Sequence, residues 1–186
     1  MPSPPSILHV IAHPAFERAR ICPALASAAD AVPGVTRHDL YEAYPSFLVD
    51  VDAEQRLLLA HEVVALQFPL FWYSTPALLK EWIDLVFTHG FAYGRGGTRL
   101  AGKTLFCALS TGGGLEAYGP SGGNRYTIDE FLRPLEQTAH LCGMRWAAPF
   151  VVHGAALLGD RDLDDLATQY AERLAELAGD VQERAA

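Results

Sequence analysis

Three short stretches of this sequence carry the residue types most suited to chemistry, and each follows an apolar run. The first is His13, the second is the aromatic bend 71–73, and the third is Ser-Thr-Gly-Gly-Gly at 110–114. Loops that follow buried strands are where proteins usually meet their ligands. We therefore treat these three stretches as candidate parts of one binding site.

The glycine stretch 110–114 offers space and hydrogen-bond donors. Glycine has no Cβ, so the backbone can approach a flat ligand closely. Successive N–H groups of such a loop can bind a carbonyl or a developing negative charge. A flexible turn without a ligand is the alternative interpretation of this stretch taken alone.

The aromatic bend and His13 suggest what the ligand is. Phe71, Trp72 and Tyr73 provide planar rings for stacking on a planar heterocycle. His13 precedes a predicted helix, whose start can hold a phosphate or ribityl group. A ring with a phosphate tail is typical of flavins and nicotinamide nucleotides. The nicotinamide signature G-x-G-x-x-G is absent after the first predicted strand, so we favour a flavin.

The elements that must position these residues alternate between strand and helix. Strand-like runs predict a parallel sheet with helices on both faces, and the weak second run predicts an edge strand. An Asp52 capping box, a Thr75 N-cap with Pro76 in the first turn, and an edge or starting position for Pro149 are also predicted. The expected strands are 7–12, 35–41, 63–68, 104–110 and 147–154, and the expected helices are 20–32, 52–61, 76–87, 128–142 and 163–177.

The fold class that fits is α/β, a flavodoxin-like doubly wound five-stranded parallel sheet. In such sheets the ligand lies beyond the carboxyl ends of the strands, at the switch in strand order. The loops after the first, third and fourth strands converge there. We expect residues 1–186 to form a single domain, with about 1–5 and 179–186 frayed.

Composition excludes several classes of protein. The chain has 186 residues, half of them apolar, and a net charge of −8, which argues against a nucleic-acid surface. No apolar run reaches membrane-spanning length, and no signal peptide is expected, which favours the cytoplasm. Peripheral contact with the inner face of the membrane is the alternative. The three widely spaced cysteines, Cys22, Cys107 and Cys142, predict free thiols and no metal site.

Several longer motifs together resemble one known family. They are "AHP", "FPLFWYSTPALLKEWIDLVF", "HGFAYGRGGTRLAGK", "STGGG" and "RPLEQTAHLCGMRW". The sequence is similar to the flavodoxin-like NAD(P)H:quinone oxidoreductases, in the bacterial branch that includes ancillary oxidoreductases of glutathione-regulated potassium-efflux systems. The resemblance runs from about Ile7 to Gly154. It implies bound FMN or FAD, NAD(P)H as electron donor, two-electron reduction of quinones, and a homodimer with the site at the subunit interface.

The resemblance also implies site residues. Tyr118 matches the family's active-site tyrosine, and Asn124 stands six residues later, where vertebrate members have a histidine, so their Tyr–His relay is not carried over. Phe91 and Tyr93 are candidate substrate contacts, within one subunit or across the dimer interface. Ala19 and Cys22 replace the hydroxyl and amide side chains that relatives use near the phosphate. The implied cofactor-binding residues are His13, Ala19, Arg20, Ile21, Cys22, Pro69, Leu70, Phe71, Trp72, Tyr73, Ser110, Thr111, Gly112, Gly113, Gly114 and Tyr118.

The favoured function is quinone reduction in which donor and acceptor bind in turn. Three other functions are alternatives to it. The first is a flavin-binding regulatory subunit of a membrane potassium-efflux transporter, with little turnover of its own. The second is a nonredox flavin or nucleotide sensor. The third is a serine hydrolase, because "GPSGG" at 119–123 matches G-x-S-x-G. That motif requires a strand immediately before it, and the predicted strand ends about ten residues earlier.

Overall fold

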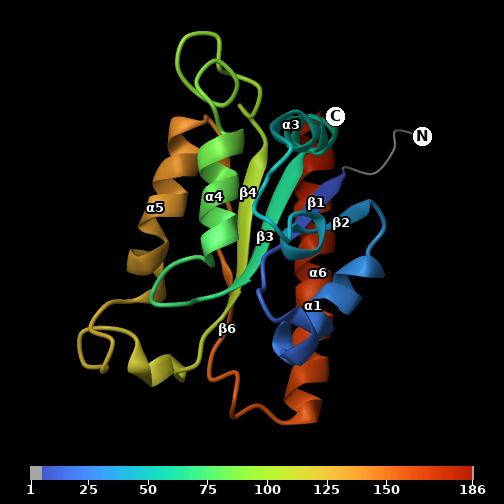
Figure 1. Cartoon of the computed structure of the whole chain (residues 1–186). Coiled ribbons are helices and arrows are strands. Elements are labelled where there is room, and N and C mark those ends of the chain that lie inside the picture. Colours follow the sequence, from blue (N-terminus) through green and yellow to red (C-terminus); the bar gives the residue numbers. More distant parts are fainter. Residues whose placement is uncertain (1–5, 186) are drawn as a thin grey trace.

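The computed structural model describes residues 6–185, and its centre is a parallel β-sheet (Figure 1). The strand order is β2-β1-β3-β4-β5, with β6 also paired to β4, so the predicted flavodoxin-like sheet and its edge strand β2 are confirmed. The predicted fraying of residues 1–5 lies outside the described residues. The strands are β1 (Ile7–Ile11), β2 (Val35–Asp39), β3 (Val63–Pro69), β4 (Thr104–Ser110), β5 (Arg145–Trp146) and β6 (Phe150–Val152).

The predicted fifth strand is divided into two short pieces. β5 pairs with the start of β4 at Thr104, and β6 pairs with its end from Ala108 to Ser110. Pro149 lies in the gap between them. Proline has no N–H to donate to a ladder, which explains why pairing stops there.

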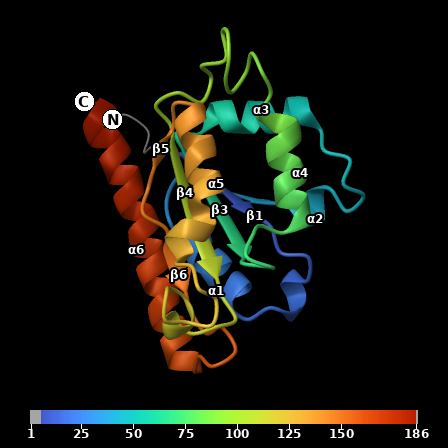
Figure 2. The same cartoon turned by 90° about the vertical axis from the view of Figure 1, so that its left-hand side faces the viewer.

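Helices cover both faces of the sheet (Figures 1 and 2). On one face, α2 to α5 pack over a core that includes Leu66, Trp82 and Leu132. On the other face, α1 and α6 pack against each other and over Phe106 and Tyr170. The helices are α1 (Ile21–Asp30), α2 (Leu40–Ala43), α3 (Val51–Ala60), α4 (Ala77–Val86), α5 (Ile128–Leu141) and α6 (Asp160–Ala185), with 3₁₀ turns η1 (Phe16–Arg18) and η2 (Leu115–Ala117).

Two predicted helix starts are corrected by the structure. Asp50, not Asp52, caps α3, because its side chain accepts a hydrogen bond from the Ala53 N–H at 3.0 Å. Pro76, not Thr75, is the N-cap of α4 and makes no side-chain cap bond. α5 begins with a capping box that was not predicted, in which Thr127 and Glu130 bond reciprocally.

The last helix is longer than predicted. α6 continues to Ala185 instead of ending at Leu177, and the expected fraying of residues 179–186 stays a prediction. Leu174, Leu177 and Ala178 are buried, and Val181 packs against the same core, which extends the anchored face of the helix. Within residues 6–185, no helix combines the length and apolar character needed to span a bilayer.

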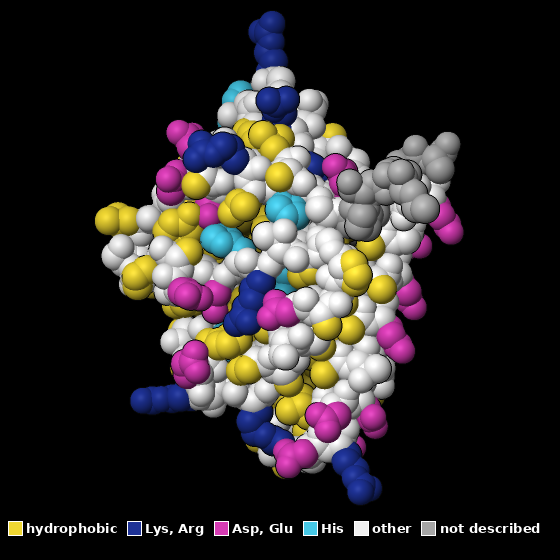
Figure 3. Space-filling model, turned by 90° about the vertical axis from the view of Figure 1, so that its right-hand side faces the viewer, with side chains coloured by type: hydrophobic (Ala, Val, Ile, Leu, Met, Phe, Trp, Pro, Cys, Tyr) yellow, Lys and Arg dark blue, Asp and Glu magenta, His cyan; other side chains and the backbone are white. Residues whose placement is uncertain are grey.

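Charged side chains of both signs lie on the face of the molecule that Figure 3 draws. Figure 3 shows Lys and Arg interspersed with Asp and Glu there, rather than gathered into one basic surface. This pattern agrees with the net charge of −8. It gives this face no continuous attraction for a phosphate backbone.

Candidate functional site

A pocket of about 420 Å³ opens at the carboxyl ends of the central strands. The loops after β1, β3 and β4 meet there, as a doubly wound sheet predicts. Loops from these strands and from the segment before α6 lie at the lower end of the molecule in Figure 1. The pocket is lined by His13, Ala19, Arg20, Ile21, Cys22, Pro69, Leu70, Phe71, Ser110, Thr111, Gly112, Ala155 and Ala156.

The start of α1 forms one wall of this pocket and offers unpaired donors. Arg20 is its N-cap residue, and no side chain caps the helix. The first N–H groups of a helix have no partner within the helix, so they can bind an anion. Arg20 itself donates to the Leu158 carbonyl at 3.0 Å and to the Asp160 carboxylate at 2.7 Å. This pairing fixes the loop before α6 beside the pocket.

Cys22 lies in the same wall but is not a reactive thiol. Burial raises the pKa of Cys22 to about 12. Gln67 donates to both the sulfur and the carbonyl oxygen of Cys22 at 2.8 Å. All three cysteines are free and buried, which confirms the predicted free thiols.

His13 sits at the mouth of the pocket with one ring nitrogen already engaged. Its Nδ1 accepts a hydrogen bond from the Ala15 N–H at 3.0 Å, so Nε2 carries the proton of the neutral ring. Burial lowers the pKa of His13, which favours that neutral form. Its ring meets Phe71 edge to face at 6.0 Å. His13 can thus donate one hydrogen bond from Nε2.

The glycine loop is held rigidly while one glycine remains open. Thr111 bonds through its backbone to Val152 and Ala155, and Gly113 accepts from Gly154 at 2.9 Å. A Cβ at Gly112 would meet no atom within 4 Å, and Gly112 lines the pocket. Gly112 is therefore the open floor position.

The other two glycines do not face open space. A Cβ at Gly113 would lie 3.0 Å from Ala117 Cβ and 3.4 Å from a ring carbon of Tyr118. A Cβ at Gly114 would overlap the Glu116 carboxylate. These two positions support the neighbouring loop rather than line the pocket.

Only the first residue of the aromatic bend lines the pocket. Trp72 and Tyr73 have φ angles of 47° and 65°, inside a turn closed by mutual backbone bonds between Phe71 and Ser74. This left-handed backbone directs Trp72 into solvent, where it is 92% exposed. Tyr73 instead stacks on Phe131 at 5.0 Å. The expected stacking wall of three rings is thus reduced to Phe71 within one subunit.

Tyr118 and Asn124 come together beside the glycine loop, next to the pocket but outside its lining. Both lie within 4 Å of the Cβ position of Gly113. Asn124 accepts a hydrogen bond from the Tyr73 hydroxyl at 3.2 Å, which ties the aromatic bend to this loop. Their catalytic role stays a prediction.

Phe91 and Tyr93 lie at the opposite edge of the sheet from the pocket. They belong to the long connection between α4 and β4, which projects at the upper end of the molecule in Figure 1. Phe91 is only 9% exposed and packs in the core. Neither residue lines the pocket within one subunit, and their contact with substrate stays a prediction.

Sequence reasoning missed the loop after β6. Ala155 and Ala156 line the pocket, and His153 bonds to Thr111. The signal was available, because "VVHGAA" (151–156) contains the carboxyl end of the predicted strand 147–154 and the first residues after it, at the same edge of the sheet. Among the described residues, no cluster of His, Cys, Asp or Glu could hold a metal ion.

Comparison with known proteins identifies the family. A model of the flavodoxin-like fold family matches residues 5–177. The chain belongs to this family. The family's potassium-efflux ancillary protein KefG from Pectobacterium carotovorum is 44% identical over 175 residues, covering 94% of this chain and 96% of the relative. A member described as the uncharacterized NAD(P)H oxidoreductase YrkL of Bacillus subtilis is 41% identical over 167 residues, covering 90% and 96%.

Solved structures of the same fold have several described activities. General stress protein 14 of Treponema denticola, solved with FMN, has a TM-score of 0.87 and 33% identity, covering 93% of this chain and 99% of that one. An NADPH-quinone reductase from P. pentosaceus has a TM-score of 0.83 and 34% identity, covering 90% and 96%. A structure described as a thermophilic tryptophan halogenase from Streptomycin violaceusniger has a TM-score of 0.88 and 41% identity, covering 90% and 97%. Since one fold hosts different chemistries, the reaction must be argued from the site.

Proposed function

We propose that this protein is an FMN-containing NAD(P)H oxidoreductase that transfers two electrons to quinones or similar flat acceptors. The observation that carries the proposal is the pocket at the carboxyl edge, where an uncapped helix start and the open floor at Gly112 meet. Relatives described as an NAD(P)H oxidoreductase, an NADPH-quinone reductase and an FMN complex support the same chemistry.

The pocket residues fit a flavin mononucleotide. Backbone N–H groups at the start of α1, with Arg20 beside them, suit a phosphate. Phe71 and the unobstructed Gly112 suit a flat ring. The bound flavin would supply the two-electron chemistry, while the chain positions the ring, excludes water and donates hydrogen bonds. The FAD alternative finds no support in the relatives above, and we propose FMN.

Donor and acceptor would occupy the same space in turn, which predicts ping-pong kinetics. Such kinetics require a single open face beside the flavin. Tyr118 and Asn124 border the glycine loop on one side, and the pocket opens beside Phe71. Initial rates measured against both substrates would give parallel double-reciprocal lines.

We also propose a homodimer whose interface closes the site. Several large apolar side chains near the pocket end of the molecule are exposed in one subunit, which is unusual for a free surface. Trp72 is 92% exposed, Leu115 68% and Tyr126 55%. Light scattering of the purified protein tests the dimer, and Trp72→Ser would weaken it.

A role beside a transporter is a second candidate, favoured by the 44% identity to KefG, which is described as an ancillary protein of a potassium-efflux system. It predicts capture of a membrane protein by the tagged chain, with little NAD(P)H oxidation. Oxidoreductase activity and transporter binding are compatible, so turnover and capture must be measured separately.

The decisive experiment is simple. Purified protein reconstituted with FMN should be yellow and should oxidise NADH or NADPH with a soluble quinone. A folded protein that retains no FMN after reconstitution would overturn the proposal. Flavin retention without turnover would favour the regulatory or sensor alternative.

A further inference from the structure

A buried glutamine connects two walls of the pocket. Gln67 is only 2% exposed and belongs to β3, two residues before Pro69, which lines the pocket. Its Nε2 donates to the carbonyl oxygen and to the sulfur of Cys22, both at 2.8 Å. Because Cys22 lies in the first turn of α1, these two bonds tie the proposed phosphate wall to the strand that leads into Phe71.

The first turn of α1 depends on this tie because Cys22 is followed by a proline. Pro23 has no N–H, so Ile21 and Cys22 are the first-turn residues that can offer one to an anion, and both line the pocket. Proline also disfavours helical backbone in the residue before it, yet Cys22 is helical. The bonds from Gln67 therefore hold Cys22 in a conformation that its sequence opposes, and they fix the direction of its N–H.

The Gln67 amide has one orientation that satisfies both of its neighbours. The Cys22 carbonyl can only accept a hydrogen bond, so the NH2 group faces Cys22 and the amide oxygen faces His9, 2.9 Å from Nε2. Burial lowers the pKa of His9 to about 4, which keeps the ring neutral near neutral pH. The neutral ring must then carry its proton on Nε2, which also lies 3.1 Å from the Tyr170 oxygen. Nδ1 has no hydrogen-bond partner within residues 6–185, which fits an acceptor rather than a buried N–H.

We propose that Gln67 is a positioning residue for the phosphate of the flavin. Through its two bonds to Cys22 it holds the Ile21 and Cys22 N–H groups toward the pocket, and the proton on His9 Nε2 keeps the amide from turning over. The identity of the ligand rests on the proposed function, whereas the positioning of an anion does not. Phosphate binding should therefore depend on Gln67 more strongly than binding of the flavin ring does.

Nitrogen NMR of the histidine rings tests the orientation of the amide in the flavin-free protein. We expect wild-type His9 to carry its proton on Nε2, and Gln67→Met to admit the Nδ1 tautomer because the selecting oxygen is gone. A wild-type His9 protonated mainly on Nδ1 would overturn the inference, since Gln67 would then present its oxygen to Cys22.

Inorganic phosphate tests the positioning without any flavin. Titration should give saturable shifts of the Ile21 and Cys22 amide signals in the wild type, and Gln67→Met should raise the dissociation constant about three- to tenfold, the effect of one or two lost hydrogen bonds. Gln55→Met is the matched control, because the Gln55 amide also joins two elements and donates to the Val86 carbonyl at 2.9 Å, at the far end of α4 from the aromatic bend. A wild type without saturable shifts, or equal constants in the wild type and Gln67→Met, would overturn the inference.

A second substitution tests whether the proline creates the dependence on Gln67. Pro23→Ala removes the clash that opposes helical backbone at Cys22 and adds one N–H. In the wild type only the added N–H contributes, so phosphate affinity should gain more from Pro23→Ala in the Gln67→Met background. Equal gains in the two backgrounds would show that Cys22 does not need Gln67.

Flavins connect this inference to the proposed function. Riboflavin shares the ring of FMN and lacks the phosphate, so the ratio of their dissociation constants reports on the phosphate end alone. Gln67→Met should weaken FMN binding by roughly tenfold and riboflavin binding by less than about twofold, while Gln55→Met leaves the ratio unchanged. An equal loss for both flavins would reduce Gln67 to a structural residue. A wild type that binds phosphate but neither flavin would overturn the proposed function and leave the positioning of an anion intact.

Discussion

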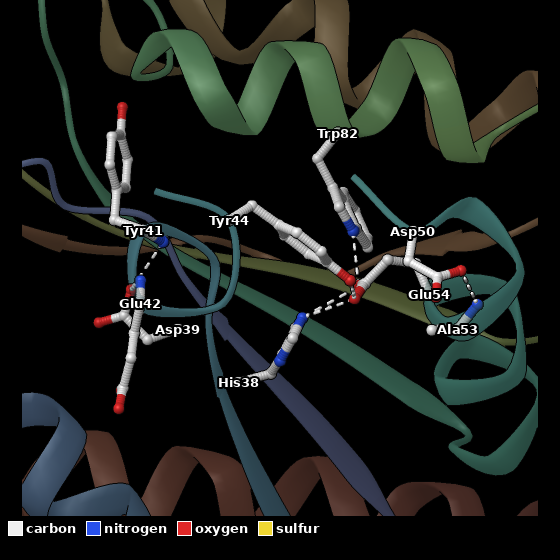
Figure 4. A network of polar contacts seen from close by, with 9 residues as sticks. All are labelled: His38, Asp39, Tyr41, Glu42, Tyr44, Asp50, Ala53, Glu54 and Trp82. Atoms are coloured by element: carbon white, nitrogen blue, oxygen red, sulfur yellow. Dashed lines mark hydrogen bonds and ion pairs between the residues drawn. The ribbon is translucent and has the colours of Figure 1, made fainter. Parts of the chain in front are cut away.

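Two polar clusters in this protein use the same kinds of side chain for different ends. In the cluster around Glu54, a buried carboxylate accepts hydrogen bonds from His38 at 2.9 Å, from Trp82 at 2.7 Å and from Tyr44 (Figure 4). In the cluster around Thr111, a histidine and a tyrosine lie side by side, and His153 retains an unengaged Nε2. The first cluster has its partners in place, whereas the second retains hydrogen-bonding capacity.

The difference in exposure explains the difference in use. Glu54 is 1% exposed and joins α3, β2 and α4, so its hydrogen bonds fix the fold. Tyr118 and His153 are half-buried at the carboxyl edge, where a ligand and solvent can reach them. A cluster with all its partners inside the protein stabilises, while one with spare capacity at a strand end is available for chemistry.

Glu54→Leu should have the largest effect on stability. It leaves the donors on His38, Tyr44 and Trp82 without their buried acceptor, which costs about 3–5 kcal/mol when one partner of a buried charged pair is removed. Urea unfolding measures the loss. FMN content per folded molecule should not change, and a stability loss under 1 kcal/mol would contradict the structural role of this cluster.

Gly112→Val should have the largest effect on the pocket with little effect on the fold. The new side chain enters the open floor, and we expect FMN affinity to fall by roughly a hundredfold because a filled pocket cannot accept the ring. Fluorescence titration with FMN measures the loss. Gly179→Val is the control, because it also adds a side chain into open space, on α6 far along the chain from the pocket.

Tyr118→Phe should affect rate alone. The ring keeps its contacts with Phe131 and His153, and only the hydroxyl is lost. We expect flavin reduction by NAD(P)H to slow by roughly tenfold, less than the loss of an essential general acid, because backbone donors share the work. Stopped-flow absorbance measures the rate. An unchanged rate would reduce Tyr118 to a packing residue.

Lowering the pH should reduce the stability contributed by the Glu54 cluster, by less than the mutation Glu54→Leu does. Burial alone would raise the pKa of Glu54, but hydrogen bonds from His38, Tyr44 and Trp82 outweigh it and lower the pKa. A lowered folded-state pKa means stability that is present above the unfolded value, near 4.5, and lost as pH falls through the folded value. As the pH falls below 5, the free energy of unfolding of Glu54→Gln should decrease less than that of the wild type. Urea unfolding at several pH values measures this.

Much of the fold could be predicted because its signals are local. β1, β3 and β4 are continuous apolar runs, and helix periodicity located α4 and α5 well. The boundaries that failed depended on single bonds or tertiary packing. Asp50 and Asp52 are both good caps, and only the folded chain shows which one is used.

The loops that form the site could be predicted from the sequence, but the directions of their side chains could not. The strand ends predicted that the loops at 13, 71–73 and 110–114 would meet, and the family resemblance added 19–22 and 69–70. The pocket brings together 13, 19–22, 69–71 and 110–112. No sequence pattern indicated the left-handed turn that directs Trp72 outward, because φ above zero is rare for bulky residues. His153 was missed because its partner Thr111 is 42 residues away in the chain.

The smallest effect we predict concerns the ion pair between Arg20 and Asp160. Both side chains are exposed, at 48% and 96%, so the pair should contribute only about 0–1 kcal/mol to stability. Asp160 nevertheless competes with an anion for the Arg20 guanidinium at the pocket wall. Asp160→Asn should therefore leave urea unfolding almost unchanged and tighten FMN binding by roughly twofold to fivefold, most clearly at low salt.

Asp30→Asn is the matched control, because Asp30 pairs with Arg37 in a partly exposed ion pair away from the pocket. FMN affinity that is unchanged from the wild type in both variants would show that Arg20 does not reach the phosphate. Equal tightening in both would mean that the gain comes from the lower overall negative charge, since both variants lose one charge. Tightening confined to Asp160→Asn would assign Arg20 to the phosphate, because only there does the removed carboxylate share its guanidinium with the pocket.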